Sequence, residues 1–599
     1  MAADLLRLVR ERLDRTTSVA RGAWTNFFWD PESTDNIPRA LQRWAQTRPH
    51  DPLLRFEGQR WTVGAFDAEV NRHARAWREL GVSSGGTVAL LVENRPAFLF
   101  HFYALAKLGV IAALINPNLR GPALRHAIAV AQPSHALVGG EQLGVLLELD
   151  DLPLPRACMF IDLELAPGED VPVEVEGFPC WNPRTSGCLP LPLGAVESIP
   201  LTEIVAYVYT SGTTGLPKPA VVKHHRLRRA ADVFGGLTRM TRDDKLYCCL
   251  PLCHASASAI AVPTVIAHRA ELILARRFSA SGFWPECRTT GATMFIYVGE
   301  LCRYLHNRPP GPDDRNHSVR TMLGNGMRQD IWPSFVERFA IDRVVEFYAA
   351  TEGNAETANL FNLEGTVGPL LPWKMALARW DVAKGELERD AKGFCVRADA
   401  GEPGLLLGKI AGKNEFVGYA DAKATKQKIL HDVFEPGDAW FDSGDLLRRD
   451  RLWHLHFVDR LGDTFRWKGE NVSTQEVAEA LNGAPGVRES TVYGVEIPGM
   501  EGRAGMAALV VEREQWSGAQ TFEHVAATLP SYAQPRFLRL VESLTTTGTF
   551  KHKKTDLQQQ GFDPTRIADP LWIRDEGQRR YVELGPEQHA LVLAGRWPL

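Results

Sequence analysis

Short apolar runs alternate along the chain with longer amphipathic stretches, a pattern typical of alternating strands and helices. Four runs have the length and composition of buried strands: residues 87–92, 205–208, 271–274 and 293–298. The apolar run 97–115 is nearly long enough to span a membrane, but His101 and Lys107 interrupt it. We therefore predict a buried helix that leads into a buried strand at 110–115. The alternation predicts an α/β fold with largely parallel sheets.

The pattern changes near residues 459–463, where charged residues and a glycine follow the strand-like run 453–458. A helix at 474–482 and a strand at 490–495 then predict a compact αβ unit. We expect a large domain over 36–460 and a smaller domain over 461–599. Stretches rich in Pro and Gly at 166–194 and 307–314 predict surface connections.

Residues 1–35 are expected to form an N-terminal helical extension. Leu5, Leu6, Val9 and Leu13 fall at helical spacing, with arginines between them. Such a helix suits the surface of a membrane, and it equally suits docking on the body of the protein.

Composition narrows the class of protein. The 599 residues are 45% hydrophobic and 23% charged, as in a soluble globular protein of several domains. A net charge of -4 argues against a nucleic-acid partner. Nine cysteines without regular spacing indicate a reducing compartment, and no secretory signal is visible, so we expect a cytoplasmic protein. Cys248, Cys249, Cys253 and His254 lack the second ligand pair of a structural zinc site.

The most informative stretch is 209–218, which follows the predicted strand at 204–208. Glycines let the backbone approach a ligand closely, while hydroxyls and a lysine add donors and positive charge. This combination predicts a polyphosphate site, although Pro219 stands where the common P-loop has Ser or Thr. The residues concerned are Thr210, Ser211, Gly212, Thr213, Thr214, Gly215 and Lys218.

Further motifs follow in order along the chain. Each is weak alone: a lone His is more often structural, Gly-Asn-Gly is often a plain turn, Thr-Glu can open a helix, and a lysine run can be a solvated patch. The motifs are 250–254 (LPLCH), 324–328 (GNGMR), 346–353 (EFYAATEG), 440–445 (WFDSGD), 459–471 (DRLGDTFRWKGEN) and 547–554 (TGTFKHKK).

Together these motifs resemble those of the adenylate-forming superfamily. The variants GNGMR, GDTFRWKGEN and TGTFKH resemble the fatty acid transport protein branch, the very-long-chain acyl-CoA synthetases. The resemblance covers the chain after residue 35. It implies a large N-terminal domain of layered, mostly parallel sheets with a distorted β-barrel, and a small mobile α+β C-terminal domain.

The resemblance also implies an activity: ATP-dependent ligation of long- or very-long-chain fatty acids to coenzyme A through acyl-AMP, with Mg²⁺. In that branch the loop at 210–218 binds phosphates and His254 lies beside the acyl carboxylate. Gly324, Asn325 and Gly326 face the adenine and the acyl pocket. Tyr348 stacks on adenine, Thr351 binds the α-phosphate and Glu352 holds the metal. Most relatives have Gly at the position of Ala349.

Towards the C-terminus, the resemblance assigns the ribose to Asp445, with Asp442 as an alternative, and ribose and phosphate to Arg460. The hinge falls at Gly462 or Asp463, and Gly469 lies along the pantetheine tunnel. Lys551 is assigned as the adenylation lysine, and Lys553 and Lys554 remain alternatives.

Two other functions stay open: an acyl-AMP ligase for another acid or acceptor, and a fatty-acid uptake protein coupled to activation. The acyl pocket is formed by dispersed residues, so the sequence leaves the chain length open, as it does the oligomeric state.

Overall fold

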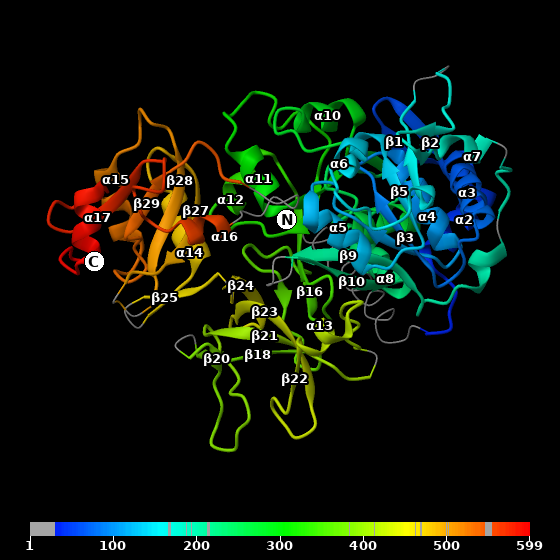
Figure 1. Cartoon of the computed structure of the whole chain (residues 1–599). Coiled ribbons are helices and arrows are strands. Elements are labelled where there is room, and N and C mark those ends of the chain that lie inside the picture. The colour runs from blue at the N-terminus through cyan, green and yellow to red at the C-terminus, as the bar shows by residue number, and fades with distance from the viewer. Residues whose placement is uncertain are drawn as a thin grey trace, which may run out of the picture. The chain divides into compact units, whose positions relative to one another are not determined.

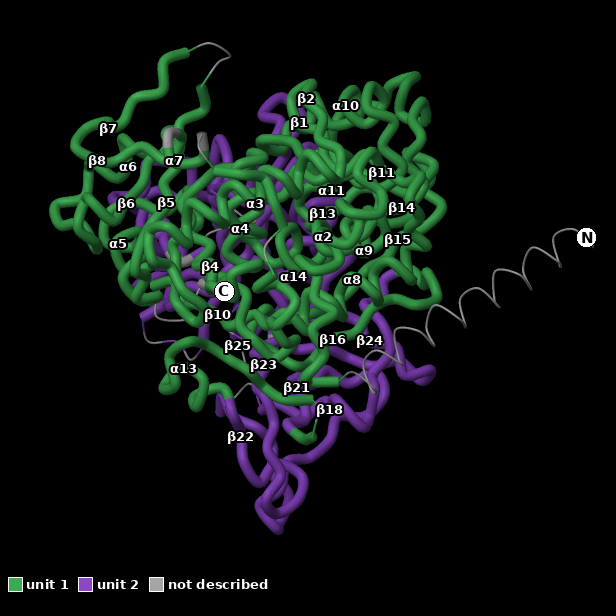
Figure 2. The backbone as a smooth tube through the Cα atoms, turned by 90° about the vertical axis from the view of Figure 1, so that its right-hand side faces the viewer, with its two compact units in different colours: residues 1–364, 411–428 green, residues 365–410, 429–599 purple. Residues whose placement is uncertain are grey.

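The structure, a computed structural model, describes residues 30–165, 169–186, 188–192, 194–211, 216–381, 384–412, 414–461, 463–467, 470–498, 500, 502–545 and 554–599. The chain divides into two compact units, residues 1–364 with 411–428 and residues 365–410 with 429–599 (Figure 2). The boundary predicted at 460 coincides with the end of a strand inside the second unit and remains a prediction.

Two sheets form the first unit. The larger sheet has the order β16-β15-β14-β13-β11-β12-β1-β2 and the smaller has the order β10-β9-β4-β3-β5-β6. Both are parallel except at the pairs β1–β2, β15–β16 and β9–β10, so the predicted α/β class is confirmed. The strands are β1 (Pro52–Phe56), β2 (Gln59–Thr62), β3 (Thr87–Leu91), β4 (Ile111–Leu114), β5 (His135–Gly139), β6 (Met159–Asp162), β9 (Ile204–Ser211), β10 (Pro217–Lys223), β11 (Lys245–Cys248), β12 (Glu271–Leu274), β13 (Met294–Val298), β14 (Thr321–Asn325), β15 (Arg343–Ala349) and β16 (Glu356–Ala358).

Helices of the first unit pack on these sheets and on one another. Helix α8 contacts β10 of one sheet and β14 and β15 of the other, so it connects the two sheets. The helices are α2 (Ile37–Thr47), α3 (Val63–Glu79), α4 (Pro96–Lys107), α5 (Gly121–Val130), α6 (Leu143–Leu147), α7 (Asn182–Ser186), α8 (His224–Thr238), α9 (Val262–His268), α10 (Phe283–Thr290), α11 (Gly299–His306), α12 (Trp332–Arg338) and α13 (Ala422–Lys426).

The predicted helix and strand within 97–115 are confirmed as α4 and β4. The two polar residues that interrupt this run are fully buried. Lys107 Nζ lies 2.5 Å from Asp67 Oδ1 and 2.8 Å from Asn71 Oδ1. His101 accepts a hydrogen bond from the Trp77 indole at 3.1 Å. Their partners compensate for the loss of water, which explains how a core helix tolerates them.

The stretch 166–194 is only partly a surface connection, because Phe178, Cys180 and Trp181 are buried. It contains the short strands β7 (Glu174–Val175) and β8 (Phe178–Pro179). The ring of Trp181 packs 4.2 Å from that of Trp77, between centroids. The prediction was wrong here because Pro and Gly mark turns but do not show what the aromatic residues between them contact.

The described part of the second unit contains two sheets of five or six strands and two sheets of two strands. A six-stranded antiparallel half-barrel sheet has the order β17-β24-β23-β21-β18, with β22 paired to β23. Its strands are β17 (Gly368–Pro369), β18 (Met375–Ala378), β21 (Pro403–Lys409), β22 (Ile429–His431), β23 (Ala439–Arg449) and β24 (His454–Arg460).

The five-stranded sheet has the order β27-β28-β29-β30-β31. Helices α14 and α16 pack on β27, and α15 packs on β31 (Figure 1). The predicted helix at 474–482 and strand at 490–495 are confirmed. The elements are β25 (Phe465–Trp467), β26 (Glu470–Val472), α14 (Thr474–Asn482), β27 (Val487–Val495), β28 (Ala504–Val511), α15 (Gly518–Thr528), β29 (Phe537–Leu540), α16 (Thr555–Gln560), β30 (Leu571–Asp575), β31 (Arg580–Glu583) and α17 (Pro586–Leu593).

Within the described ranges, no helix has the length and the apolar character that crossing a membrane requires. Of the helical extension predicted over 1–35, residues 1–29 lie outside those ranges, and residues 30–35 form a turn and irregular backbone before α2.

Candidate functional site

The predicted phosphate loop joins two antiparallel strands, β9 and β10. Thr210 is paired in register with Lys218, so both side chains lie on one face of the hairpin. Tyr209 points to the opposite face, where its hydroxyl donates to the carbonyl oxygen of Ala127 at 2.6 Å. Gly212, Thr213, Thr214, Gly215 and the side chain of Ser211 lie outside the described part of the chain.

Tyr419, which the sequence did not single out, connects the hairpin to the predicted metal ligand. The segment 418–420 pairs with β10, because Val221 N donates to Gly418 O and Ala420 N donates to Pro219 O, both at 2.9 Å. The Tyr419 hydroxyl donates to Glu352 Oε1 at 2.8 Å. It also shares a side-chain hydrogen bond with Thr210, while burial and the charge of Glu352 raise the pKa of Tyr419.

Thr351 and Glu352 lie in the connection between β15 and β16. Arg226, from α8, donates to the carbonyl oxygen of Ala350 at 2.6 Å and to that of Thr351. Burial lowers the pKa of Arg226, while the charge of Glu352 acts in the opposite direction. The loop that carries both predicted site residues is therefore held by its backbone.

The turn at 324–327 is held in a similar way by Glu346, from β15. Glu346 Oε1 accepts from Gly326 N at 2.5 Å and Met327 N at 3.1 Å, and the Tyr297 hydroxyl donates to Oε2. A Cβ on Gly324 would lie 2.2 Å from Tyr297 O, so only glycine fits there. Gly326 has φ of +81°, which also favours glycine. Asn325 is the last residue of β14.

Burial raises the pKa of Glu346 to about 8, although its three hydrogen bonds favour the carboxylate. Two residues along β15, Tyr348 is 8% exposed. Glu346 and Tyr348, both buried, thus carry the turn support and the predicted adenine contact on the same strand.

Asn94 positions the loop that contains His254. Its amide donates to Leu250 O at 2.8 Å and accepts from Leu252 N at 2.7 Å. His254 precedes a π-helix at Ser256–Ala261, a type of segment frequent at functional sites. The nearby cysteines are buried, and burial raises the pKa of Cys248 to about 12. No three His, Cys, Asp or Glu side chains within the described ranges form a group able to hold a metal ion.

In the second unit, Asp445 and Arg460 form one polar pair. They are opposite each other in the β23–β24 register, and Arg460 Nε lies 3.7 Å from Asp445 Oδ1. Asp442 instead accepts from Gly444 N at 2.8 Å, within its own turn.

Lys554 is engaged near the predicted hinge. Its ammonium lies 3.0 Å from Asp463 Oδ2 and 2.8 Å from Thr474 Oγ1. Lys551, Lys553, Gly462 and Gly469 fall outside the described ranges. Among the three lysines considered for adenylation, Lys554 is the one that the structure describes, and the assignment to Lys551 stays a prediction.

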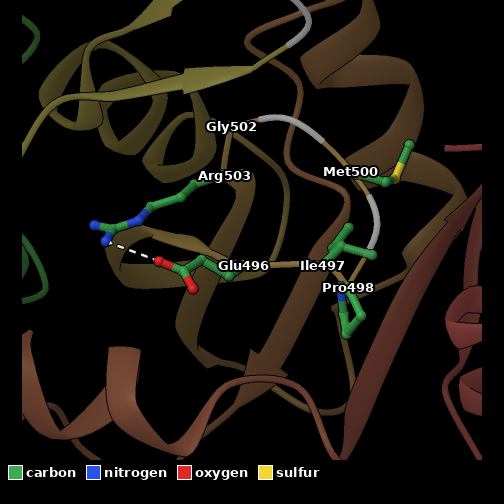
Figure 3. Close-up of a pocket in the computed structure, with 6 residues that line it drawn as sticks. All are labelled: Glu496, Ile497, Pro498, Met500, Gly502 and Arg503. Carbon is green, nitrogen blue, oxygen red and sulfur yellow. Dashed lines mark hydrogen bonds and ion pairs between the residues drawn. The ribbon is translucent and has the colours of Figure 1, made fainter.

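One pocket of the second unit lies beside β27, around Ile497, Pro498, Met500 and Gly502 (Figure 3). Across it, Arg503 Nη2 lies 3.1 Å from Glu496 Oε1. None of the six described residues that line this pocket is a predicted site residue, so the candidate site rests on the loops above.

Comparison with known proteins identifies the family. Residues 41–406 match the model of the AMP-binding enzyme, and residues 476–551 match that of the AMP-binding enzyme C-terminal domain. The chain belongs to the AMP-binding enzyme family. It is 39% identical to the medium/long-chain-fatty-acid–CoA ligase FadD6 of Mycobacterium tuberculosis, over 99% of this chain and 97% of that protein. It is 38% identical to human long-chain fatty acid transport protein 1, over 94% of this chain and 88% of that protein.

Solved structures of this AMP-binding enzyme family share the fold. The anthranilate CoA ligase AuaEII in complex with anthranoyl-AMP has a TM-score of 0.74 at 21% identity, over 89% of this chain and 98% of that one. ATP-bound MatB from Rhodopseudomonas palustris has a TM-score of 0.72 at 21% identity, over 88% and 98%. The predicted fold class and superfamily are therefore confirmed.

Sequence reasoning missed three residues that hold the loops of the candidate site: Tyr419, Arg226 and Asn94. Tyr419 follows a glycine in a polar stretch, and Arg226 is one of several arginines at the start of α8. Neither pattern differs from that of a solvated surface, so no local signal could have found them.

Glu346 gives a prediction about pH. Its folded-state pKa, about 8, lies above the ordinary value of 4.5. Between these values the folded chain holds a proton that the unfolded chain releases, so this group's contribution to the free energy of unfolding falls as pH rises. Glu346→Gln keeps the acceptor for Gly326 and Met327 but cannot titrate.

The measurement is the melting temperature of wild type and Glu346→Gln, by calorimetry below and above the pKa of Glu346. We expect the wild type to lose stability relative to the variant as pH rises. A difference in melting temperature that does not change with pH would show that Glu346 is already ionised.

Proposed function

We propose that this AMP-binding enzyme is an ATP-dependent fatty acyl-CoA ligase that forms an acyl-AMP intermediate. The observation that carries the proposal is the full-length similarity to a medium/long-chain-fatty-acid–CoA ligase, at 39% identity. The contacts that link Thr210, Tyr419 and Glu352 support it, because they gather phosphate-binding and metal-binding groups.

In the first step, a carboxylate oxygen of the fatty acid attacks the α-phosphorus of ATP. The new O–P bond forms as the bond to the β-phosphate oxygen breaks, which releases pyrophosphate. The carboxylate is a poor nucleophile and the triphosphate repels it, so positioning and charge neutralisation must supply the catalysis. We assign Lys218, Thr210 and the loop at 211–215 to the phosphates, Thr351 to the α-phosphate and Lys551 to the charge that develops between the reactants.

The turn at Gly324, Asn325 and Gly326, with Tyr348, is assigned to the adenine, and Asp445 with Arg460 to the ribose. His254 is assigned a place beside the acyl carboxylate.

Glu352 fits the requirements of Mg²⁺. Its Oε1 accepts from Tyr419, and no hydrogen bond to Oε2 is found among the described residues. Mg²⁺ is commonly held by one or two carboxylates together with substrate phosphates and water. When bound, the ion would neutralise charge on the phosphate oxygens.

In the second step, the thiol of coenzyme A attacks the acyl carbonyl carbon, the C–S bond forms, AMP leaves and the thiol proton is released. We propose that Gly469 lines the path of the thiol and that residues 461–599 rotate about Gly462 between the steps. Support comes from the resemblance of 459–471 to the hinge motif of the superfamily, since a glycine there can absorb a large φ/ψ change.

Two alternatives differ in what happens to the carboxylic acid. An acyl-AMP ligase for another acceptor would release pyrophosphate but form no acyl-CoA, and a lipid-binding or uptake protein with little turnover would release little pyrophosphate. A pyrophosphate-release screen over acids of graded chain length, with and without coenzyme A, tests all three. Release with long-chain acids and formation of acyl-CoA are expected. No release with any acid would contradict the proposal.

The contact between Tyr419 and Glu352 predicts that changing either residue alters how the rate of adenylation depends on Mg²⁺. Glu352→Gln should sharply reduce adenylation, because an amide is a poorer ligand for Mg²⁺ than a carboxylate. Tyr419→Phe removes one hydrogen bond to a charged group, typically about 1.5–3 kcal/mol, so a loss of roughly tenfold or more is expected. The measurement is acyl-AMP formation across Mg²⁺ concentrations. Wild-type rates in Glu352→Gln would remove Glu352 from the metal site.

Lys551 and Gly469 should separate the two half-reactions. Lys551→Ala should slow adenylation by about 10²–10³, the usual cost of losing one stabilising group, but still convert supplied acyl-AMP to acyl-CoA. Gly469→Leu should do the reverse, because its side chain would fill the thiol path. Equal slowing of both steps in Lys551→Ala would contradict the assignment and make Lys553→Ala the next variant to test.

We also propose that the protein is cytoplasmic and contacts the inner face of the membrane through residues 1–17. The motivating observation is the helical spacing of leucines between arginines. Deleting residues 1–17 should weaken co-sedimentation with liposomes and leave activity on short, soluble acids. Unchanged co-sedimentation would exclude this role.

A further inference from the structure

Helix α8 connects the two loops on which adenylation depends. It begins at His224, directly after β10, the second strand of the phosphate-loop hairpin. It then contacts β14 and β15 of the other sheet. A single helix therefore spans from the phosphate hairpin to the strands that end in the adenine turn and in the Thr351–Glu352 loop.

Two arginines one turn apart on α8 reach the connection between β15 and β16. Residues three apart lie on the same face of a helix. Arg226 donates to the carbonyl oxygens of Ala350 and Thr351, and Arg229 forms an ion pair with Glu356. The connection is thus held at its beginning by Arg226 and at its end by Arg229.

This arrangement places two positive charges close together inside the protein. Burial, and secondly the charge of Arg226, lower the pKa of Arg229 to about 9. The Arg229 side chain is 16% exposed and that of Glu356 is 25% exposed. Enclosed ion pairs can often be replaced by apolar side chains without loss of stability, so the fold alone gives little reason for two partly buried arginines one turn apart.

We propose that Arg226 and Arg229 are positioning residues for adenylation, which clamp the Thr351–Glu352 loop onto α8. This inference rests on the proposed function. The clamp holds the Thr351 hydroxyl and the Glu352 carboxylate at a fixed place relative to the phosphate hairpin. The side chain of Glu352 stays free to meet Tyr419 and Mg²⁺, because Arg226 binds backbone oxygens of the loop and not this carboxylate.

If Arg226 clamps the loop through two carbonyl oxygens, lysine cannot replace it. A guanidinium presents several donors in a planar fork, which can reach two adjacent carbonyl oxygens, whereas an ammonium group is a point charge on a flexible stem. Arg226→Lys keeps the charge and most of the length of the side chain. It therefore separates the geometry of the clamp from its charge.

Arg228 offers a matched control on the same helix. It lies 3.1 Å from Asp35 and 3.1 Å from Asp232, in both cases between side-chain nitrogen and carboxylate oxygen. Neither partner belongs to the β15–β16 connection. Arg228→Met removes an arginine of similar sequence context but should leave the clamp intact.

The experiment compares Arg226→Lys, Arg226→Met, Arg229→Met and Arg228→Met in the full-length protein. The readouts are pyrophosphate release across Mg²⁺ concentrations, conversion of supplied acyl-AMP to acyl-CoA, and melting temperature. Misplacing a reacting group by about 1 Å can cost roughly 10²-fold, and we expect a loss of that order in adenylation for both Arg226 variants. The second half-reaction and the melting temperature should stay close to wild type, and Arg228→Met should behave as wild type throughout.

Arg229 and Glu356 can be tested as a pair. If they act through one contact, the effects of Arg229→Met and Glu356→Gln on adenylation should not add in the double variant. Strictly additive effects would overturn the role of this ion pair in the clamp.

Three results would overturn the proposal: full adenylation by Arg226→Lys, equal loss in both half-reactions, or losses that follow the melting temperature. Calorimetric binding of ATP with and without Mg²⁺ gives a readout that needs no turnover. If the wild type forms no acyl-AMP but the Arg226 variants lose the Mg²⁺-dependent gain in ATP binding, the proposed function fails and the clamp stands. If they keep that gain, the clamp fails.

Discussion

Polar side chains that bind loop backbone determine the geometry of this site. Loops at the carboxyl ends of parallel strands have no neighbouring strand to pair with, so their backbone groups need other partners. Three of these loops receive one from a neighbouring element. Asn94 binds the loop after β11, Glu346 binds the turn after β14, and Arg226 binds the connection after β15. The predicted ligand-binding side chains belong to loops whose backbone these three residues hold in place.

The fold and the order of the motifs could be predicted from the sequence. Apolar periodicity places β12 and α14 at the residues expected, because burial on one face leaves a repeat that needs no long-range information. Candidate ligand groups such as Glu352 and Asp445 were assigned through the resemblance of several short motifs, in order, to those of the adenylate-forming superfamily, and their roles stay predictions.

The supports of the site could not be predicted, because each acts across a large distance in sequence. Tyr419 reaches Glu352 over 67 positions and Arg226 reaches Ala350 over 124. The burial of Trp181 could not be predicted for the same reason, since only the fold shows that it packs on Trp77. Asp442 and Asp445 are equivalent on residue type, and only the fold shows their different contacts: Asp442 accepts from Gly444 N, whereas Asp445 lies beside Arg460.

The central claim is that this AMP-binding enzyme activates a carboxylic acid by attack on the α-phosphorus of ATP. The most direct test follows oxygen from substrate to product. A long-chain fatty acid labelled with ¹⁸O in its carboxylate is incubated with the protein, ATP, Mg²⁺ and coenzyme A, and the nucleotide products are analysed by mass spectrometry. The account predicts AMP that carries one ¹⁸O atom, together with acyl-CoA that retains the other. Formation of ADP, or of AMP without the label, would contradict it.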